Sequence, residues 1–235
     1  MAQRLVFYST AADDLMVYKE ELTSFTFYSG FAISQKQKSI NSLHESIRSA
    51  HPVAKPLDIS SKSEDALGVS LSAFNLFYRD DETSETYKLE NVFQSSKVYE
   101  SGGPYIDLLH VSPAEAKKDT RHHTSGVLKC FRLKDWECPL EPKTMFYDWL
   151  YCKSLSQNPV LTKALIAGGY DAFTDIEFNH NKSLNCQARA VAIFVTLYNR
   201  GIINEYLDDR DKWATIYEAT KDKREPEQLS LDFGL

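Results

Sequence analysis

The sequence predicts a single α+β domain that is mainly helical and carries an N-terminal extension of strands and a helix. Three observations support this. Apolar residues recur at helical spacing in several segments between residues 89 and 220. β-Branched and aromatic residues concentrate in short runs near the N-terminus. The 235 residues, 43% of them hydrophobic, are also enough to bury one full core.

The first 65 residues form the predicted extension, which we expect to pack on the main domain. Residues 5–8 and 22–28 are typical of strands because β-branched and aromatic residues fill them. Ser34 can cap a helix that ends before His51 and has three apolar residues at helical spacing, Ile40, Leu43 and Ile47. Residues 51–65 are rich in Pro, Ser, Lys and Asp, so we expect a connector rather than a packed element.

Residues 66–220 form the predicted main domain. Ser112 and Glu115 have the spacing of a capping box, with Pro113 at the first helical position. Helical spacing or start signals predict further helices over 89–99, 143–156, 158–167, 187–199 and 211–220. One strand is expected over 172–178, which would place Phe173, Asp175 and Glu177 on one face.

Charge and cysteine usage exclude several classes of protein. The 27 basic and 33 acidic residues give a net charge of −6, which argues against a broad basic surface for nucleic acid. We find no secretory signal and no apolar run near 18 residues, so we expect a cytoplasmic protein without a membrane span. Reduced thiols are the simplest interpretation of four cysteines without paired spacing, and a zinc site is the alternative. We expect no metal and no cofactor.

The clearest candidates for chemistry are acidic and basic side chains inside patterned segments. Glu90 and Lys97 are seven residues apart on one predicted helix, with Gln94 between them, so all three could line one wall of a pocket. A solvated helix face would show the same spacing. Asp175 and Glu177 could equally be exposed strand residues. The sequence contains no catalytic triad, phosphate loop or dinucleotide fingerprint.

Several of these segments resemble the NADAR family. Residues 72–78, Ser-Ala-Phe-Asn-Leu-Phe-Tyr, and 89–97, Leu-Glu-Asn-Val-Phe-Gln-Ser-Ser-Lys, are similar to that family's Ser-Pro-Phe-Ser-Asn-Phe-Tyr-like turn and Val-Glu-His-Tyr-Tyr-Gln-Ala-Gln-Lys-like helix. Residues 113–117, Arg121 and 145–165 extend the resemblance, which covers roughly residues 66–180.

The chain also departs from the family pattern. Leu76 stands where the family has Asn, with Asn75 one step earlier, and residues 173–186 replace a closing Asp-x-x-Trp-Gly segment. Residues 30–40 and 174–179 look more like the NADAR branch encoded beside DarT-type toxins.

The resemblance implies a YbiA-like domain that removes ADP-ribose from guanine bases in DNA, as the antitoxin to a DNA ADP-ribosyltransferase toxin encoded nearby. ADP-ribosylated DNA would be the substrate and ADP-ribose the product. Glu90 is the first choice for the catalytic carboxylate and Asp175 the second. Lys97 would bind the diphosphate or form a transient Schiff base with the opened ribose. The remaining candidates would bind ADP-ribose: Asn75, Phe77, Tyr78, Gln94, Arg121, Trp136 and Glu177.

Two other functions remain open at this point. One is the N-glycosidase of the riboflavin pathway, which is also a NADAR activity and which the N-terminal extension disfavours. The other is a non-catalytic ADP-ribose-binding module. Catalytic release of ADP-ribose from modified DNA separates these alternatives from the first interpretation.

The last segment, residues 221–235, is predicted to be a flexible tail. Gln-Leu-Ser-Leu-Asp-Phe at 228–233 resembles the bacterial sliding-clamp-binding motif at Gln228, Leu229, Leu231 and Phe233. A flexible tail can place a few apolar anchors in a partner's pocket. The alternative is a tail that packs against its own domain.

Overall fold

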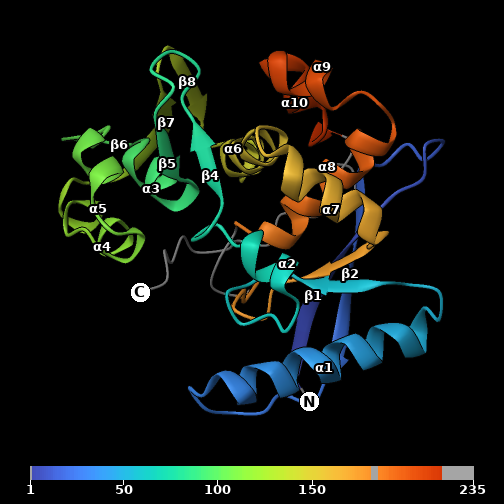
Figure 1. Ribbon diagram of the computed structural model, residues 1–235. Helices are drawn as coiled ribbons and strands as arrows, with labels where there is room; N and C mark the ends of the chain where they lie inside the picture. Colours follow the sequence, from blue (N-terminus) through green and yellow to red (C-terminus); the bar gives the residue numbers. More distant parts are fainter. Residues whose placement is uncertain (1, 181–184, 219–235) are drawn as a thin grey trace.

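The computed structural model describes residues 2–180 and 185–218 and shows a single α+β domain built around a four-stranded sheet (Figure 1). The sheet order is β2-β1-β9-β3. Its strands are β1 (Ala2–Ser9), β2 (Tyr18–Phe25), β3 (Pro56–Asp58) and β9 (Ala172–Thr174). β1 pairs antiparallel with β2 and β9, whereas β3 runs parallel to β9. Strands from both ends of the chain therefore share one sheet.

Helices cover both faces of this sheet, α1 (Ile33–Ala50) on one and α8 (Gln187–Asn199) on the other. Successive residues of a strand point to opposite faces. Val6 accordingly packs in one apolar cluster with Leu43 and Ile47 of α1, and Phe7 packs in the larger cluster with the residues of α8. The N-terminal hairpin and α1 thus have a core of their own that is continuous with the sheet.

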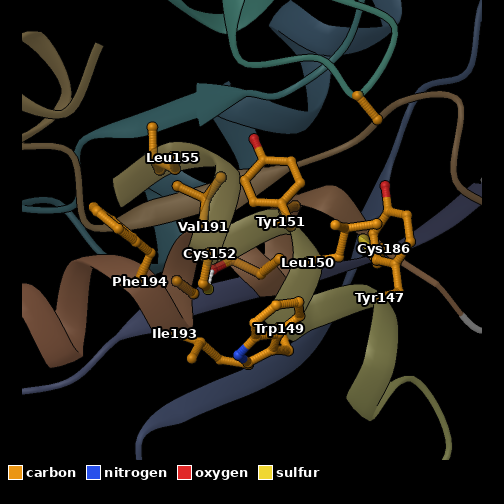
Figure 2. Close-up of a cluster of buried hydrophobic side chains, with 14 of the residues drawn as sticks. Tyr147, Trp149, Leu150, Tyr151, Cys152, Leu155, Cys186, Val191, Ile193 and Phe194 are labelled. Atoms are coloured by element: carbon orange, nitrogen blue, oxygen red, sulfur yellow. Dashed lines mark hydrogen bonds between the residues drawn. The ribbon is translucent and has the colours of Figure 1, made fainter. Parts of the chain in front are cut away.

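The larger core lies between α8 and α6 (Met145–Ser156), which Figure 2 shows from close by. Almost every residue of α6 is buried, as expected for a helix that is surrounded by other elements. Trp149 and Tyr151 of α6 pack beside Val191 and Phe194 of α8. The Tyr151 hydroxyl donates to the Leu71 carbonyl at 2.5 Å. The four cysteines are buried and free.

The other elements surround α6. A three-stranded sheet in the order β6-β7-β8 and the β4-β5 hairpin lie on one side, and α9 and α10 lie on another (Figure 1). Their bounds are α2 (Ala66–Ser70), β4 (Phe77–Arg79), β5 (Thr86–Lys88), α3 (Leu89–Ser95), β6 (Lys97–Tyr99), η1 (Ile106–His110), α4 (Pro113–Lys117), α5 (Arg121–Thr124), β7 (Leu128–Leu133), β8 (Trp136–Pro139), α7 (Pro159–Gly168), α9 (Ile203–Asp208) and α10 (Arg210–Thr215). No described helix has the length and apolarity needed to cross a bilayer.

Several sequence predictions are confirmed. The two N-terminal strands form, although the second lies at Tyr18–Phe25 rather than at 22–28, and helices occupy the ranges predicted around 143–156, 158–167 and 187–199. The capping box of α4 is complete, with the Ser112 hydroxyl accepting from the Glu115 amide and the Glu115 carboxylate accepting from the Ser112 amide.

Three predictions about N-terminal and strand segments are wrong. Residues 51–65 are not a mere connector, because β3 inside them is buried and pairs with β9. Ser34 does not cap α1, which begins at Ile33 after Ala32 without a side-chain cap. The strand predicted over 172–178 ends at Thr174, since the Asp175 carboxylate accepts the Glu177 amide and turns the chain there.

The helix predicted over 89–99 is also too long. α3 ends at Ser95, and the next residues form β6, which pairs with β7. Lys97 is therefore the first residue of a strand rather than a member of the same helix as Glu90. The predicted helix over 211–220 corresponds to α10, which ends at Thr215, and residues 219–220 lie outside the described chain, as does the tail at 221–235 with its clamp-like motif.

Candidate active site

Three side chains at the α3–β6 junction form a hydrogen-bonded chain. The Gln94 amide Nε2 donates to Glu90 Oε1 at 2.9 Å, and Lys97 Nζ donates to Gln94 Oε1 at 2.7 Å. Glu90 and Gln94 meet because they are one helical turn apart. Lys97 reaches Gln94 although it has left the helix, because the strand starts two residues after α3 ends. The structure thus brings the three predicted residues together.

The surroundings of Lys97 change its acid–base behaviour. Its Nζ lies 5.2 Å from the centre of the Phe93 ring, which belongs to an aromatic stack with Phe131 and Phe146. Burial lowers the pKa of Lys97 to about 8, the Glu90 carboxylate opposes this shift, and the nearby Lys117 reinforces it. A lysine with a pKa near 8 is partly neutral in neutral solution, and a neutral amine is a nucleophile.

Asp175 lies at the turn that follows β9. Its Oδ2 accepts from Gln187 Nε2 at 2.9 Å, and its Oδ1 accepts from the Glu177 amide at 3.0 Å. Burial raises the pKa of Asp175 to about 6, so the acid and its conjugate base are both accessible near neutral pH. A carboxyl with such a pKa can donate or accept a proton in catalysis.

Gln187 and Tyr147 link the two acidic groups. Gln187 Oε1 accepts from the Ala73 amide at 2.6 Å, and the Ala73 carbonyl accepts from the Glu90 amide at 3.3 Å. Tyr147 of α6 is buried, and the negative charges of Glu90 and Asp175 both help to raise the pKa of its phenol well above the usual value. The phenol therefore lies within electrostatic reach of both carboxylates, close to Cys186 (Figure 2).

Cations from three elements surround these groups. Lys117 of α4 is exposed, and its Nζ lies 5.8 Å from the ring centre of the half-exposed Phe74. Lys36 of α1 forms an ion pair with Glu177, Nζ to Oε1 3.0 Å. The guanidinium of Arg4 on β1 interacts electrostatically with Asp175 and Glu177. The N-terminal hairpin and α1 thus contribute charge to the same edge of the molecule.

Three predicted site residues lie in other surroundings. Tyr78 is buried, and the charges that act on it are those of Lys134, Asp80, Asp81 and Arg210. The ring of Trp136 packs against Trp149 at 4.9 Å and under the Arg210 guanidinium at 4.2 Å. Arg121 is held by two carboxylates, those of Asp107 and Asp119. A diphosphate would have to compete with both of these ion pairs.

Asn75 and Phe77 have local roles in the turn before α3. The Asn75 side chain donates to the Val69 carbonyl at 2.9 Å and so closes the end of α2. Phe77 is 45% exposed, and Lys88 Nζ lies 3.9 Å from its ring centre. Of these two residues, Phe77 has the ring surface that a base could reach.

Several residues of the site were not selected from the sequence. Lys117 belongs to a segment that resembles the family, as does Tyr147, but nothing in the sequence singles out Arg4, Tyr147 or Gln187. They reach the site from β1, α6 and α8, and only the packing of these elements brings them together. In residues 2–180 and 185–218, no group of three or more His, Cys, Asp or Glu side chains could hold a metal ion.

A cavity of about 630 Å³ lies elsewhere, between the β1–β2 hairpin and the turn after α1. Tyr8, Glu21, His51 and Asp171 are among its lining residues, and none of Glu90, Lys97 and Asp175 lines it. Its size does not make it the better candidate, because the carboxylates that line it are not buried as those of Glu90 and Asp175 are, and Lys97 lies outside it.

The sequence also matches a model of a protein family. The model of the DarT1-associated NADAR antitoxin matches residues 2–227. The chain belongs to this family. The matched range includes the N-terminal hairpin and α1 as well as the Glu90–Gln94–Lys97 chain, and the description of the family implies an antitoxin with a cognate DarT toxin as its partner. No curated protein matches the chain.

Proposed function

We propose that this NADAR antitoxin removes ADP-ribose from guanine bases in DNA by breaking the N-glycosidic bond at C1″ of the ribose. The observation that supports this proposal best is the chain from Glu90 through Gln94 to Lys97. It places a carboxylate and an amine of lowered pKa on either side of one glutamine. During cleavage of a glycosidic bond the sugar carbon becomes cationic, so negative charge is needed near it. A nucleophile that bonds to this carbon when the base leaves is the second requirement.

These residues can carry out the reaction in two steps. The neutral Lys97 amine adds to C1″ of the opened ribose, the C1″–N bond breaks, and guanine leaves with the electron pair and takes up a proton. Water then adds to the resulting Schiff base, which returns the amine and releases ADP-ribose. Glu90 stabilises the cationic carbon and exchanges the proton with water.

Other residues of the site support binding and proton transfer. Asp175, whose pKa burial raises to about 6, can protonate the leaving base and then regain a proton from the water that adds to the Schiff base. Lys117 is exposed, and it forms no ion pair with another described residue, so it suits a diphosphate better than Arg121 does. The exposed faces of Phe74 and Phe77 suit the adenine or the guanine.

Incubation with a chemically defined ADP-ribosylated oligonucleotide tests the proposal. We expect multiple turnovers that release free ADP-ribose and unmodified DNA, measured by chromatography and mass spectrometry. Reduction with borohydride during turnover should attach one ADP-ribose to the peptide that contains Lys97. Stoichiometric binding without release would instead assign the chain to non-catalytic ADP-ribose binding. Turnover without a trapped adduct would reject the covalent step and leave Lys97 as a diphosphate ligand.

The tail supplies a second, separate proposal, that residues 228–233 bind a bacterial sliding clamp in the cytoplasm and bring the acidic enzyme to DNA by raising its local concentration. A calorimetric titration of the full chain and of a chain ending at Glu227 against a bacterial clamp tests it. We expect binding by the full chain alone, and equal behaviour of the two chains would refute the proposal.

A further inference from the structure

The loop between β2 and α1, residues 26–32, exposes three aromatic rings. Phe27 and Tyr28 are about two-fifths exposed, and Phe31 is fully exposed. Aromatic rings grouped this closely on a surface usually mark a place where something binds.

This β2–α1 loop is fixed to α1 rather than loosely attached. The Ser42 hydroxyl accepts from the Thr26 amide at 3.0 Å, and the Ser39 hydroxyl accepts from the Tyr28 amide at 2.9 Å. Phe27 also makes an edge contact with the buried Phe25, with ring centres 6.4 Å apart. Residues 26–28 are therefore held in place before any ligand arrives, which reduces the entropy cost of binding there.

The loop is continuous with the candidate active site. Lys36 Nζ lies 5.8 Å from the Phe27 ring centre and 3.0 Å from the Glu177 carboxylate. The backbone amide of Glu177 in turn donates to Asp175. A chain of contacts thus leads from the exposed rings to one of the two buried carboxylates. Lys38 of α1 adds a second cation and, unlike the partly buried Lys36, is exposed.

We propose that the β2–α1 loop and the first turns of α1 bind the single-stranded DNA that flanks the modified guanine. This inference rests on the proposed function and adds the location of the bound polynucleotide. Aromatic faces stack on bases without reading their sequence, and lysines contact phosphates. The net charge of −6 excludes a broad basic surface, so the contacts with DNA must be local.

Burial of the catalytic groups explains why the bound strand must be unpaired. Glu90 is 6% exposed and Asp175 is also 6% exposed, so a base stacked inside a duplex could not reach them. An enzyme with such a site acts on single strands or extrudes the nucleotide from the duplex. The rings of the loop can then replace the stacking that the neighbouring bases lose.

Binding of unmodified DNA tests this inference without any need for catalysis. Fluorescence anisotropy with a labelled 12-nucleotide single strand should show Phe31→Ala binding about five- to 150-fold more weakly than the wild type. Leu15→Ala is the matched control, because Leu15 is 94% exposed in the loop between β1 and β2, at the end of β2 that is opposite the β2–α1 loop. This variant should bind the strand as the wild type does. Lys38→Ala should lower the slope of log affinity against log salt concentration by about one, as expected for the loss of one phosphate contact. Lys163→Ala on α7 should leave this slope unchanged.

Catalysis provides the second comparison. Phe31→Ala should raise KM for an ADP-ribosylated oligonucleotide and leave KM for ADP-ribosylated guanosine unchanged, since the nucleoside has no flanking strand. Unchanged oligonucleotide binding by Phe31→Ala would overturn the inference. If this variant instead loses binding to the toxin and keeps binding to DNA, the inference is also overturned and the loop is assigned to a protein partner. If the wild type binds the strand through Phe31 but releases no ADP-ribose, the loop inference stands and the proposed function fails.

Discussion

The two proposed roles of Lys97 require different protonation states of its side chain. With a pKa of about 8, it is mostly an ammonium at pH 6 and mostly a neutral amine at pH 9. If the amine attacks C1″, kcat should rise with pH about tenfold per unit below 8 and then level off. If the ammonium only binds the diphosphate, affinity for ADP-ribose should fall through the same range. Measurement of kcat and of ADP-ribose affinity between pH 6 and 9.5 distinguishes the two roles.

A substitution sharpens this test. Lys97→Arg keeps a positive charge that is not lost below pH 12, so it can bind an anion but cannot act as a nucleophile. We expect it to lose turnover and retain ADP-ribose binding. The matched control is Lys117→Arg, which changes an exposed lysine of the same site and should retain turnover. Full activity of Lys97→Arg would exclude the covalent step.

Glu90 tests the need for negative charge at the reacting carbon. Glu90→Gln keeps an acceptor for the Gln94 amide and removes only the charge, so the fold should be unchanged by circular dichroism and melting temperature. We expect kcat to fall about a hundredfold or more, as is usual for a group of this kind. Activity within about threefold of the wild type would move the catalytic role to Asp175.

At the scale of elements, a buried ion pair joins α6 and α8. Arg189 donates from Nε and Nη2 to the two oxygens of Asp148, at 3.0 and 3.1 Å, and the Tyr217 hydroxyl donates to the same carboxylate at 2.8 Å. Asp148→Ala would leave the buried guanidinium without this carboxylate. We expect the free energy of unfolding, measured by urea denaturation, to fall by about 3–5 kcal/mol.

An exposed ion pair is the control for this effect. Arg132 and Glu137 face each other across β7 and β8, with Nη2 2.6 Å from Oε2. Because water screens both groups, Glu137→Ala should cost no more than about 1 kcal/mol. Similar losses for Asp148→Ala and Glu137→Ala would mean that the buried pair is not what joins α6 to α8.

Elements with strong local signals could be predicted from the sequence, and those that depend on distant partners could not. The capping box at Ser112 and the Asn158 cap before Pro159 are local, and both helices begin there. β3 contains the acidic Asp58 and is only three residues long, so no local pattern marks it as a buried strand. Its partner β9 is more than a hundred residues away in the sequence, and this pairing makes it a strand.

The same limit applies to the site. Glu90, Gln94 and Lys97 lie within eight residues of one another, so a motif could mark them, and the error about the end of the helix did not separate them. Tyr147 lies within residues 145–165, which resemble the family, but no motif marks it there, and Arg4 and Gln187 come from segments with no such motif. Their positions depend on how β1, α6 and α8 pack, which spacing along the chain does not encode.

At the scale of the whole molecule, the N-terminal segment completes the sheet that carries Asp175. β9 lies between β1 and β3, and Asp58 Oδ2 accepts from the Thr174 hydroxyl and the Ile176 amide, both at 3.0 Å. His44 of α1 contacts the same Thr174 hydroxyl at 3.1 Å. The N-terminal residues therefore stabilise the strand end from which the acidic side chains of the site emerge.

The buried Asp58 should make the stability of this junction depend on pH. Burial, and then the charge of Asp175, raises its pKa from 3.8 to about 7. The folded protein thus retains a proton that the unfolded chain releases, so the stabilisation is fully present below about pH 4 and is lost as pH rises through 7. His44 acts in the opposite direction between about pH 4 and 6.5, because burial lowers its pKa to about 4.

Comparison with Asp58→Asn isolates the effect of the carboxyl. An amide at this position can accept from Thr174 and Ile176 and donate to the Ser60 hydroxyl, so the fold should persist. Between pH 4.5 and 7.5, the free energy of unfolding of the wild type should fall relative to that of Asp58→Asn, because only the wild type must ionise the buried Asp58, whereas Asp175 is common to both proteins. The control Asp211→Asn alters an exposed carboxylate and should run parallel to the wild type. Parallel curves for Asp58→Asn as well would show that Asp58 is already ionised in the folded protein, and that the junction of β3 with β9 tolerates its charge.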